Sequence, residues 1–367
     1  MRIVVASDKF KGTLGSLAAG RAIAGGIARY QPEAQIAIHA VADGGEGTID
    51  ALSSVPGTVV DHVRATGSMG EAVTARVLTL GDVRVVEASE VTGVSARPGG
   101  HSALEATSYG LGQTIGHAAR DGSEVLVAIG GTGSTDGGTG MARALGWRFL
   151  DRRGRDLPAG GGALVDLSSV VPPPEQLDLA VTGLRDVNSP LLGERGAARM
   201  FAPQKGAGPA EVAVLEQGLG ILAEVLLRDL GTDVARIAGG GAGGGIGAGL
   251  TAFLGARSVP GFERIAGETS LQGALEGADL VVTGEGHFDE ASLGGKVPVG
   301  VAGLAARAGV PCALVAGRIS VSEARFRAAG ITIAVSLEEL VGAQVAIAEP
   351  EESLARATVE MMRRGGY

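Results

Sequence analysis

Acidic and basic side chains recur directly after short apolar runs that are typical of buried β-strands. Asp8, Lys9 and Lys11 follow the first run, at residues 2–7. The same placement is repeated along the chain at Asp43, Glu46, Asp136, Asp186, Glu285, Asp289 and Lys296. Ligands bind at the carboxyl ends of the strands in wound α/β sheets. We therefore expect these side chains to be catalytic or ligand-binding residues.

Carboxylates gathered at such an edge suit a hard cation, because Mg²⁺ prefers oxygen ligands and leaves coordination places for substrate phosphates. The candidate ligands are Asp43, Glu46, Asp136, Glu285 and Asp289. The alternative for each aspartate is a helix cap, in which the carboxylate accepts hydrogen bonds from the first N–H groups of the next helix. Close glycines in several of these loops favour the ligand hypothesis for the group as a whole.

A glycine-rich stretch at residues 238–250, AGGGAGGGIGAGL, is a second candidate site. Bare glycines let backbone N–H groups approach a phosphate at a helix start. The predicted nucleotide-binding positions are Gly239, Gly241, Gly243, Gly244 and Gly245. The stretch lacks the Lys-Ser/Thr of a Walker loop, and close packing of a helix is the alternative explanation.

Lys205 lies in the segment PQKGAG, where a turn would present its ammonium group to a carboxylate or a phosphate. The alternative is a solvated lysine on a surface turn. No G-x-S-x-G segment follows a strand, so the pattern does not favour a serine hydrolase.

Alternation of β-branched runs with helical segments indicates parallel sheets covered by helices. We expect strands at residues 2–7, 35–42, 124–130, 177–184, 279–284, 312–317 and 331–336, and a hairpin through Gly81-Asp82. The fold class is α/β with two domains. A flavodoxin-like doubly wound sheet is built from residues 1–60 and 236–367, and a mixed α/β domain at 61–235 is inserted between them.

The composition restricts the partners and the location that we expect for the protein. A net charge of −9 with no basic run argues against a nucleic-acid partner. A single cysteine and the absence of a signal peptide or apolar span predict a cytoplasmic protein without a membrane partner. The oligomeric state is left open, with a homo-oligomer among the alternatives.

Eight ordered segments together resemble the bacterial glycerate kinase family, in its type 1 or D-glycerate 2-kinase form. They are DKFKGTL, ADGGEGT, TSYGLG, GGTGSTDGGTGM, DVNSPLLG, FAPQKGA, GGGAGGGIGAGL and DLVVTGEGHFDEASLGGKVPVGVA. The resemblance runs nearly end to end. It implies a flavodoxin-like domain and an inserted domain with the active site between them, ATP as co-substrate, Mg²⁺ as cofactor, and 2-phosphoglycerate or 3-phosphoglycerate as product.

Several residues depart from the family pattern. Lys9 replaces a serine, Thr135 an asparagine and His287 an arginine, and further departures stand at Ser189, Ala291 and Ser292. These residues are candidates for contacts that select the acceptor. The kinase class therefore follows from the resemblance more directly than the acceptor does.

We expect ATP-dependent phosphorylation of D-glycerate to 2-phosphoglycerate. The carboxylates hold Mg²⁺ and orient the glycerate hydroxyls, and one aspartate, with Asp186 as an alternative, takes the proton of the attacking hydroxyl. Lys11, Lys205 and Lys296 neutralise the substrate carboxylate and the moving phosphoryl group. The alternatives are another small hydroxy acid as acceptor, a nicotinamide-dependent dehydrogenase, and a sensor that binds an acidic metabolite without turnover.

Overall fold

The computed structural model describes residues 1–93, 102–175 and 178–367. It divides into two compact units: unit 1 comprises residues 1–43, 50–56 and 262–367, and unit 2 comprises residues 44–49 and 57–261. The expected boundary at 236 is therefore displaced. Residues 236–261 belong to unit 2, because β10 (Arg257–Pro260) pairs in parallel with β9 (Val181–Arg185) and because α8 (Ala242–Leu254) packs into the same apolar core.

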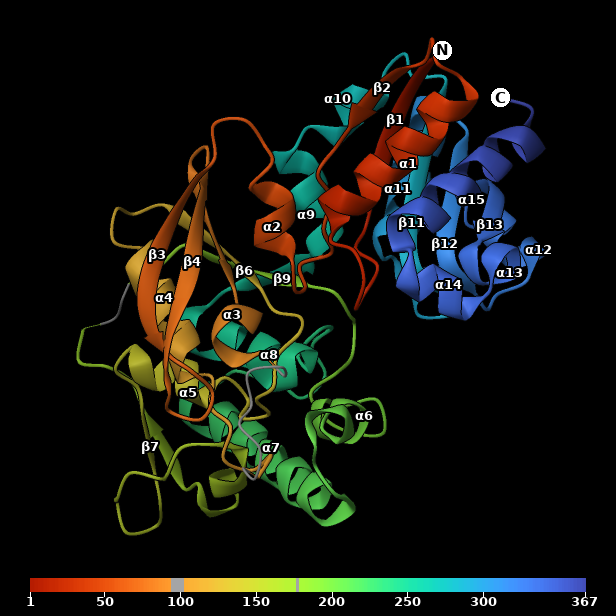
Figure 1. Ribbon diagram of the computed structural model, residues 1–367. Helices are drawn as coiled ribbons and strands as arrows, with labels where there is room; N and C mark the ends of the chain where they lie inside the picture. The colour runs from red at the N-terminus through yellow and green to blue at the C-terminus, as the bar shows by residue number, and fades with distance from the viewer. Residues whose placement is uncertain (94–101, 176–177) are drawn as a thin grey trace. The chain divides into compact units, whose positions relative to one another are not determined.

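Unit 1 is built around a parallel five-stranded sheet to which both ends of the chain contribute (Figure 1). The strands lie in the order β13 (Ile331–Ser336), β12 (Cys312–Ile319), β11 (Leu280–Phe288), β1 (Arg2–Ser7), β2 (Gln35–Ile38). Numbered along this unit alone, the order is that of a flavodoxin-like sheet, 2-1-3-4-5. The expected α/β fold class is confirmed.

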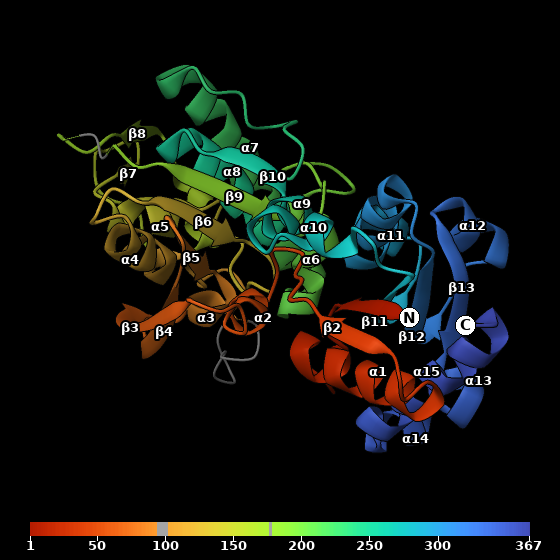
Figure 2. The same cartoon turned by 90° about the horizontal axis from the view of Figure 1, so that it is seen from above.

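Alternation along the strands of unit 1 sends side chains to two apolar cores, one on each face of the sheet. Ile3 and Val5 point to the face covered by α1 (Ser16–Tyr30) and α15 (Pro350–Gly365), and Val4 points to the face covered by α11 (Val297–Ala308). Figure 2 shows these helices on opposite sides of the sheet. The remaining helices of the unit are α9 (Gly261–Glu268), α10 (Leu271–Leu275), α12 (Glu323–Ala328), α13 (Leu337–Val341) and α14 (Ala343–Ala348).

Unit 2 contains a mixed six-stranded sheet. Its strands lie in the order β10, β9, β6 (Glu124–Ala128), β5 (Val83–Glu87), β4 (Ala72–Leu80), β3 (Val59–Thr66), and the last two pairings are antiparallel. A short pair, β7 (Arg148–Leu150) and β8 (Ser169–Val171), stands apart from this sheet. The helices that share its core include α3 (Ser89–Thr92), α4 (Tyr109–Ala118), α5 (Thr139–Ala144), α6 (Ala197–Phe201), α7 (Pro209–Leu230) and α8, whereas α2 (Thr48–Leu52) begins in unit 2 and ends in unit 1.

Most expected elements agree with the structure. The predicted hairpin through Gly81-Asp82 is confirmed as the β4–β5 pair. Three strands are shorter than expected, because β2 ends at Ile38, β6 ends at Ala128 and β9 begins at Val181. Leu177, at the expected start of β9, lies outside the described residues. In the part of the chain that the structure describes, no helix combines the length and the apolar character needed to cross a membrane.

Helices α1 and α15 meet at a glycine of α1. A Cβ atom at Gly26 would lie 2.5 Å from the Ala355 carbonyl oxygen and 2.7 Å from the Thr358 Cβ, both on α15. The neighbouring Gly25 has open space where its Cβ would stand. Close backbone approach of the two helices, and hence the joining of the two chain ends in unit 1, therefore requires glycine at position 26 only.

Gly26→Ala should lower the free energy of unfolding by about 2 kcal/mol, because overpacking at a backbone carbonyl forces the helices apart. Gly25→Ala is the matched control and should raise that free energy by up to about 1 kcal/mol, because alanine restricts the unfolded chain and favours the helix. Urea unfolding of both variants measures the difference. Equal effects of the two substitutions would contradict the packing argument.

Candidate functional site

Two buried carboxyl groups lie side by side at the switch point of the unit 1 sheet. Strands β1 and β11 pair in parallel with Ser7 opposite Gly284, and the Asp8 N–H donates to the Gly284 carbonyl at 2.9 Å. Asp8 and Glu285 are therefore the next residues on adjacent strands. Connections leave these two strands in opposite directions, and ligands of doubly wound sheets bind at such a point. The structure brings together these two expected site residues.

Burial dominates the electrostatics of this pair. Asp8 is 7% exposed and Glu285 is 5% exposed. Burial, with the nearby charge of Asp43, raises the pKa of Asp8 to about 7, against the opposing effects of Lys9 and Lys296. Burial likewise raises the pKa of Glu285 to about 8, against Ser292 and Lys296. Glu285 Oε1 is buried without a hydrogen-bond partner, so one oxygen of the pair remains unsatisfied.

Lysines surround the pair. Lys9 Nζ lies 3.8 Å from an Asp43 carboxylate oxygen, and both side chains are largely buried. Lys296 is the residue before the first turn of α11, and its charge acts on Asp8 and on Glu285. Lys11 is exposed. Unit 1 therefore combines acids and ammonium groups at one edge of its sheet.

Asp289 caps the loop that follows β11. One carboxylate oxygen accepts the N–H groups of Ala291 at 2.9 Å and of Ser292 at 3.1 Å. Although burial opposes the shift, the Ser292 N–H and the charge of Lys296 lower the pKa of Asp289. The side chain of His287 meets the Ser320 hydroxyl at 2.6 Å. His287 thus lies near the end of β11, and Ala291 and Ser292 lie after it. The capping alternative describes the observed contacts of Asp289.

A second group of carboxylates lies at the ends of β6 and β9 in unit 2. A Cβ atom at Gly130 would lie 2.7 Å from an Asp186 carboxylate oxygen, and one at Gly131 would lie 2.9 Å from the Glu46 Cβ. Glu46 and Asp186 therefore both border the Gly130-Gly131 pair. The Gly130 N–H also donates to the Gly44 carbonyl at 3.2 Å. The structure brings this second pair of expected residues together within unit 2.

Lys205 is buried, at 5% exposure, rather than solvated on a turn. Its Nζ donates to the Ser134 carbonyl at 2.6 Å and would lie 2.8 Å from a Cβ atom at Gly244. Gly244, with φ of 70°, has the left-handed conformation that favours glycine, and a side chain there would also clash with the Ser134 carbonyl.

Close packing accounts for other glycines in the same stretch. A Cβ atom at Gly241 would clash with the Pro190 carbonyl, and one at Gly245 would lie 2.7 Å from Gly137 Cα. The chain's own backbone thus occupies the space that these glycines leave. The packing alternative explains these positions without a ligand.

The capping alternative describes the observed contacts of Asp136. Its carboxylate is fully buried and accepts hydrogen bonds from Ser108 N at 2.7 Å, Ser108 Oγ at 2.9 Å, and the N–H groups of Gly138 and Gly140 at 3.1 Å. These bonds join the start of α4 to the start of α5. A carboxylate that is saturated by donors and closed to solvent is a structural cap, so we leave Asp136 out of the proposed site.

The five expected metal ligands do not form one cluster within either unit. Among residues 1–93, 102–175 and 178–367, no three His, Cys, Asp or Glu side chains come close enough together to hold a metal ion. Asp43, Glu285 and Asp289 belong to unit 1, whereas Glu46 and Asp136 belong to unit 2. A metal site within one unit would rest on two carboxylates and on oxygen atoms of the substrate.

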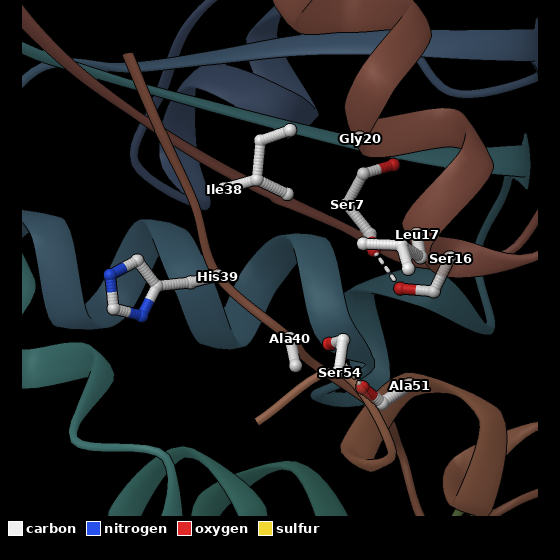
Figure 3. A pocket seen from close by; sticks show the side chains of 9 residues that line it. All are labelled: Ser7, Ser16, Leu17, Gly20, Ile38, His39, Ala40, Ala51 and Ser54. Carbon is white, nitrogen blue, oxygen red and sulfur yellow. Dashed lines mark hydrogen bonds between the residues drawn. The ribbon is translucent and has the colours of Figure 1, made fainter. Parts of the chain in front are cut away.

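Two hollows in the described surface are lined by other residues. Figure 3 shows a hollow in unit 1, lined by side chains from the start of α1 and the end of β2, in which the Ser16 hydroxyl donates to the Ser7 carbonyl at 2.5 Å. Desolvation and the charge of Arg2 lower the pKa of His39, which stands at one end of it. A cavity of about 500 Å³ in unit 2 is lined by β3, α4 and α5. Neither contains an expected site residue.

One sequence signal was missed. The chain has only four lysines against 27 arginines, and all four, Lys9, Lys11, Lys205 and Lys296, stand in the loops described above. Lys9, which follows the first strand and departs from the family pattern, lies against Asp43. Lysine usage alone therefore marks the candidate site.

A flavodoxin-like parallel sheet with buried carboxyl groups and lysines at its switch point, accompanied by a second α/β unit, defines an enzyme that acts on a small anionic ligand. Residues 3–365 match the model of the glycerate kinase family. The chain belongs to this family, and it is a kinase. The resemblance stated from the motifs is thereby confirmed, and ATP use follows from the class.

Named relatives cover almost the whole chain. A glycerate kinase of Halalkalibacterium halodurans is 38% identical over 91% of this chain and 90% of its own length. The glycerate 2-kinase of Escherichia coli is 35% identical over 87% of this chain and 86% of its own length. The crystal structure of a Salmonella typhimurium LT2 protein assigned as glycerate kinase 2 matches with a TM-score of 0.81 and 34% identity, and covers 100% of both chains.

The buried pair predicts a pH-dependent stability. Folded Glu285 keeps its proton to a pH of about 8, whereas the unfolded chain loses it near 4.5, so the folded state binds more protons between these values. The free energy of unfolding therefore falls as pH rises through this window. Glu285→Gln cannot ionise and should exceed wild type by roughly 2 to 4 kcal/mol at pH 8.5, with little difference at pH 4.

Urea unfolding at both pH values, with EDTA present, measures this gap. Glu290→Gln is the control, because Glu290 is exposed and pairs with Arg325 at 2.7 Å. The difference in free energy of unfolding between this variant and wild type should be the same at both pH values. A Glu285→Gln gap that does not grow with pH would contradict the burial argument.

Proposed function

We propose that the protein transfers the γ-phosphoryl group of ATP to D-glycerate, with 2-phosphoglycerate and ADP as products. The observation that carries the proposal is the buried Asp8–Glu285 pair at the switch point of unit 1, with lysines acting on it. The relative named as a glycerate 2-kinase supports the choice of the 2-hydroxyl. A small acid with adjacent hydroxyls needs both cationic and carboxylate partners, and this edge of the sheet offers both.

In the proposed reaction, the glycerate hydroxyl oxygen forms a bond to the γ-phosphorus, and the bond from that phosphorus to the bridging oxygen of ADP breaks. The hydroxyl proton passes to Asp8. A general base works best when its pKa lies near the operating pH, and burial raises the pKa of Asp8 to about 7. Asp186, the alternative base, borders Gly130 in unit 2.

The donor set fits Mg²⁺. The ion is commonly held by one or two carboxylates together with substrate phosphates. Glu285 offers a buried oxygen without a partner, and Asp43 is close enough to Asp8 to raise its pKa. Glu285 and Asp43 would hold the ion, which when bound supplies positive charge to the phosphate oxygens. Ionising two neighbouring buried acids is costly, and this cost favours a further cation at the site.

We assign the four lysines to the anionic parts of the substrates. Lys296, with Lys9 and Lys11, neutralises the phosphoryl group and the glycerate carboxylate from unit 1. In unit 2, we assign Lys205, Glu46 and Asp186 to the same phosphoryl transfer. Transfer of a phosphoryl group depends on positioning and charge neutralisation more than on covalent catalysis, which suits such a set.

A coupled ADP-release assay over a panel of hydroxy acids tests the proposal. We expect ADP only when ATP, Mg²⁺ and D-glycerate are all present, and phosphorus NMR of the product should show 2-phosphoglycerate. A 3-phosphoglycerate signal, or turnover with a different acid only, would replace the acceptor or the position and keep the kinase class. Binding of D-glycerate without ADP release would favour a sensor.

Lys296→Met should lower turnover at least tenfold and move the acid limb of the pH profile of kcat/KM to higher pH. The positive charge of Lys296 favours ionised Asp8, so its removal raises the pKa of that carboxyl group. Arg307→Met, in the last turn of the same helix, is the control. Lys296→Met kinetics within twofold of wild type, with the acid limb unmoved, would remove Lys296 from the site.

A further inference from the structure

Glu87 is a buried carboxylate that no motif singled out. It is the last residue of β5, is 4% exposed, and stands opposite Ala128 in the parallel pairing with β6. Burial raises its pKa, and the hydrogen bonds that it accepts oppose this shift. A buried acid that ends a central strand on the same edge as Glu46 and Asp186 needs an explanation.

The partners of Glu87 come from the loop that carries Glu46. One carboxylate oxygen accepts the Gly47 N–H at 2.8 Å, and the other accepts the Ile49 N–H at 3.0 Å. The Ser89 hydroxyl donates to the first oxygen at 2.5 Å. The two N–H groups flank the start of α2, so one side chain determines the path of the backbone directly after Glu46.

The same contacts extend to the end of β6. A Cβ atom at Gly131 would lie 2.9 Å from the Glu46 Cβ and 3.2 Å from the Ser89 Cβ. Gly131 has a φ of 78°, which favours glycine. Glu46 is itself exposed. The hydrogen bonds from Gly47 N–H and Ile49 N–H to Glu87 therefore fix the backbone of this loop.

We propose that Glu87 is a positioning residue, which fixes the backbone of residues 46–49 and thereby the direction of the Glu46 carboxylate toward the substrate. This inference rests on the proposed function for its catalytic consequence, but not for the structural step. Glutamine is a poor replacement, because it has one acceptor oxygen and its NH₂ group would face a backbone N–H donor.

The test is a double-mutant cycle in the ADP-release assay, with Glu87→Gln, Glu46→Gln and the double variant. Glu87→Gln should lower kcat/KM for D-glycerate 10- to 100-fold while the melting temperature stays close to that of Asp151→Asn. Asp151 is the control, because its carboxylate also accepts two backbone N–H groups, from Arg153 and Arg155, in a turn of the same unit. In the Glu46→Gln background, Glu87→Gln should change kcat/KM by less than threefold.

Additive losses in the cycle, or a Glu87→Gln loss below twofold, would overturn the proposal. Amide hydrogen exchange separates this outcome from a failure of the proposed function. Glu87→Gln should speed exchange at Gly47 and Ile49, whereas Asp151→Asn should not; unchanged exchange at both amides would refute the structural step even if the wild type shows no turnover. Ser89→Ala removes only the hydroxyl and provides a milder variant if Glu87→Gln does not fold. It should lower kcat/KM measurably but by less than tenfold. An unchanged kcat/KM of Ser89→Ala would refute the proposal.

Discussion

The parallel pairing of β1 with β11 is the interaction on which unit 1 depends. It joins segments 277 positions apart, through the Asp8 N–H to the Gly284 carbonyl, the Thr283 hydroxyl to the Ala6 carbonyl at 2.8 Å, and the Arg2 N–H to Asp279 at 2.7 Å. The pairing creates the switch point of the sheet and places two acids next to each other in a buried position. Burial is the main cause of the raised pKa of each acid.

Local patterns predicted much of the fold. The bounds of β1 and β13 follow from apolar runs and from the residues that separate elements. The boundary at 236 could not be read, because the glycines of α8 carry no apolar period that distinguishes one core from another. Its place in unit 2 is set by long-range contacts, namely the pairing of β10 with β9 and the packing of Gly244 and Gly245 against residues 134–137.

The acids after the strands look alike in the sequence but differ in hydrogen bonding. Asp136 and Glu87 are saturated by backbone N–H donors and hold loops together, whereas Glu285 retains a buried oxygen without a partner. Spacing shows that an acid follows a strand; it does not show whether the next turn supplies donors. The sequence therefore predicted that these acids follow strands, and it could not separate the caps from the acids that keep an oxygen without a donor.

Lysine and arginine occupy different kinds of position in this structure. Arginines pair with surface acids, as at Arg148–Asp156 and Arg327–Glu323. The planar guanidinium group of arginine matches the geometry of a carboxylate. Lysine is a compact point charge, and at Lys205 it fits beneath a left-handed glycine where a guanidinium group would need more room. The restriction of lysine to four site loops is thus consistent with sites shaped around a small ammonium group. An Arg-for-Lys exchange at Lys205 would keep the charge and lose the fit.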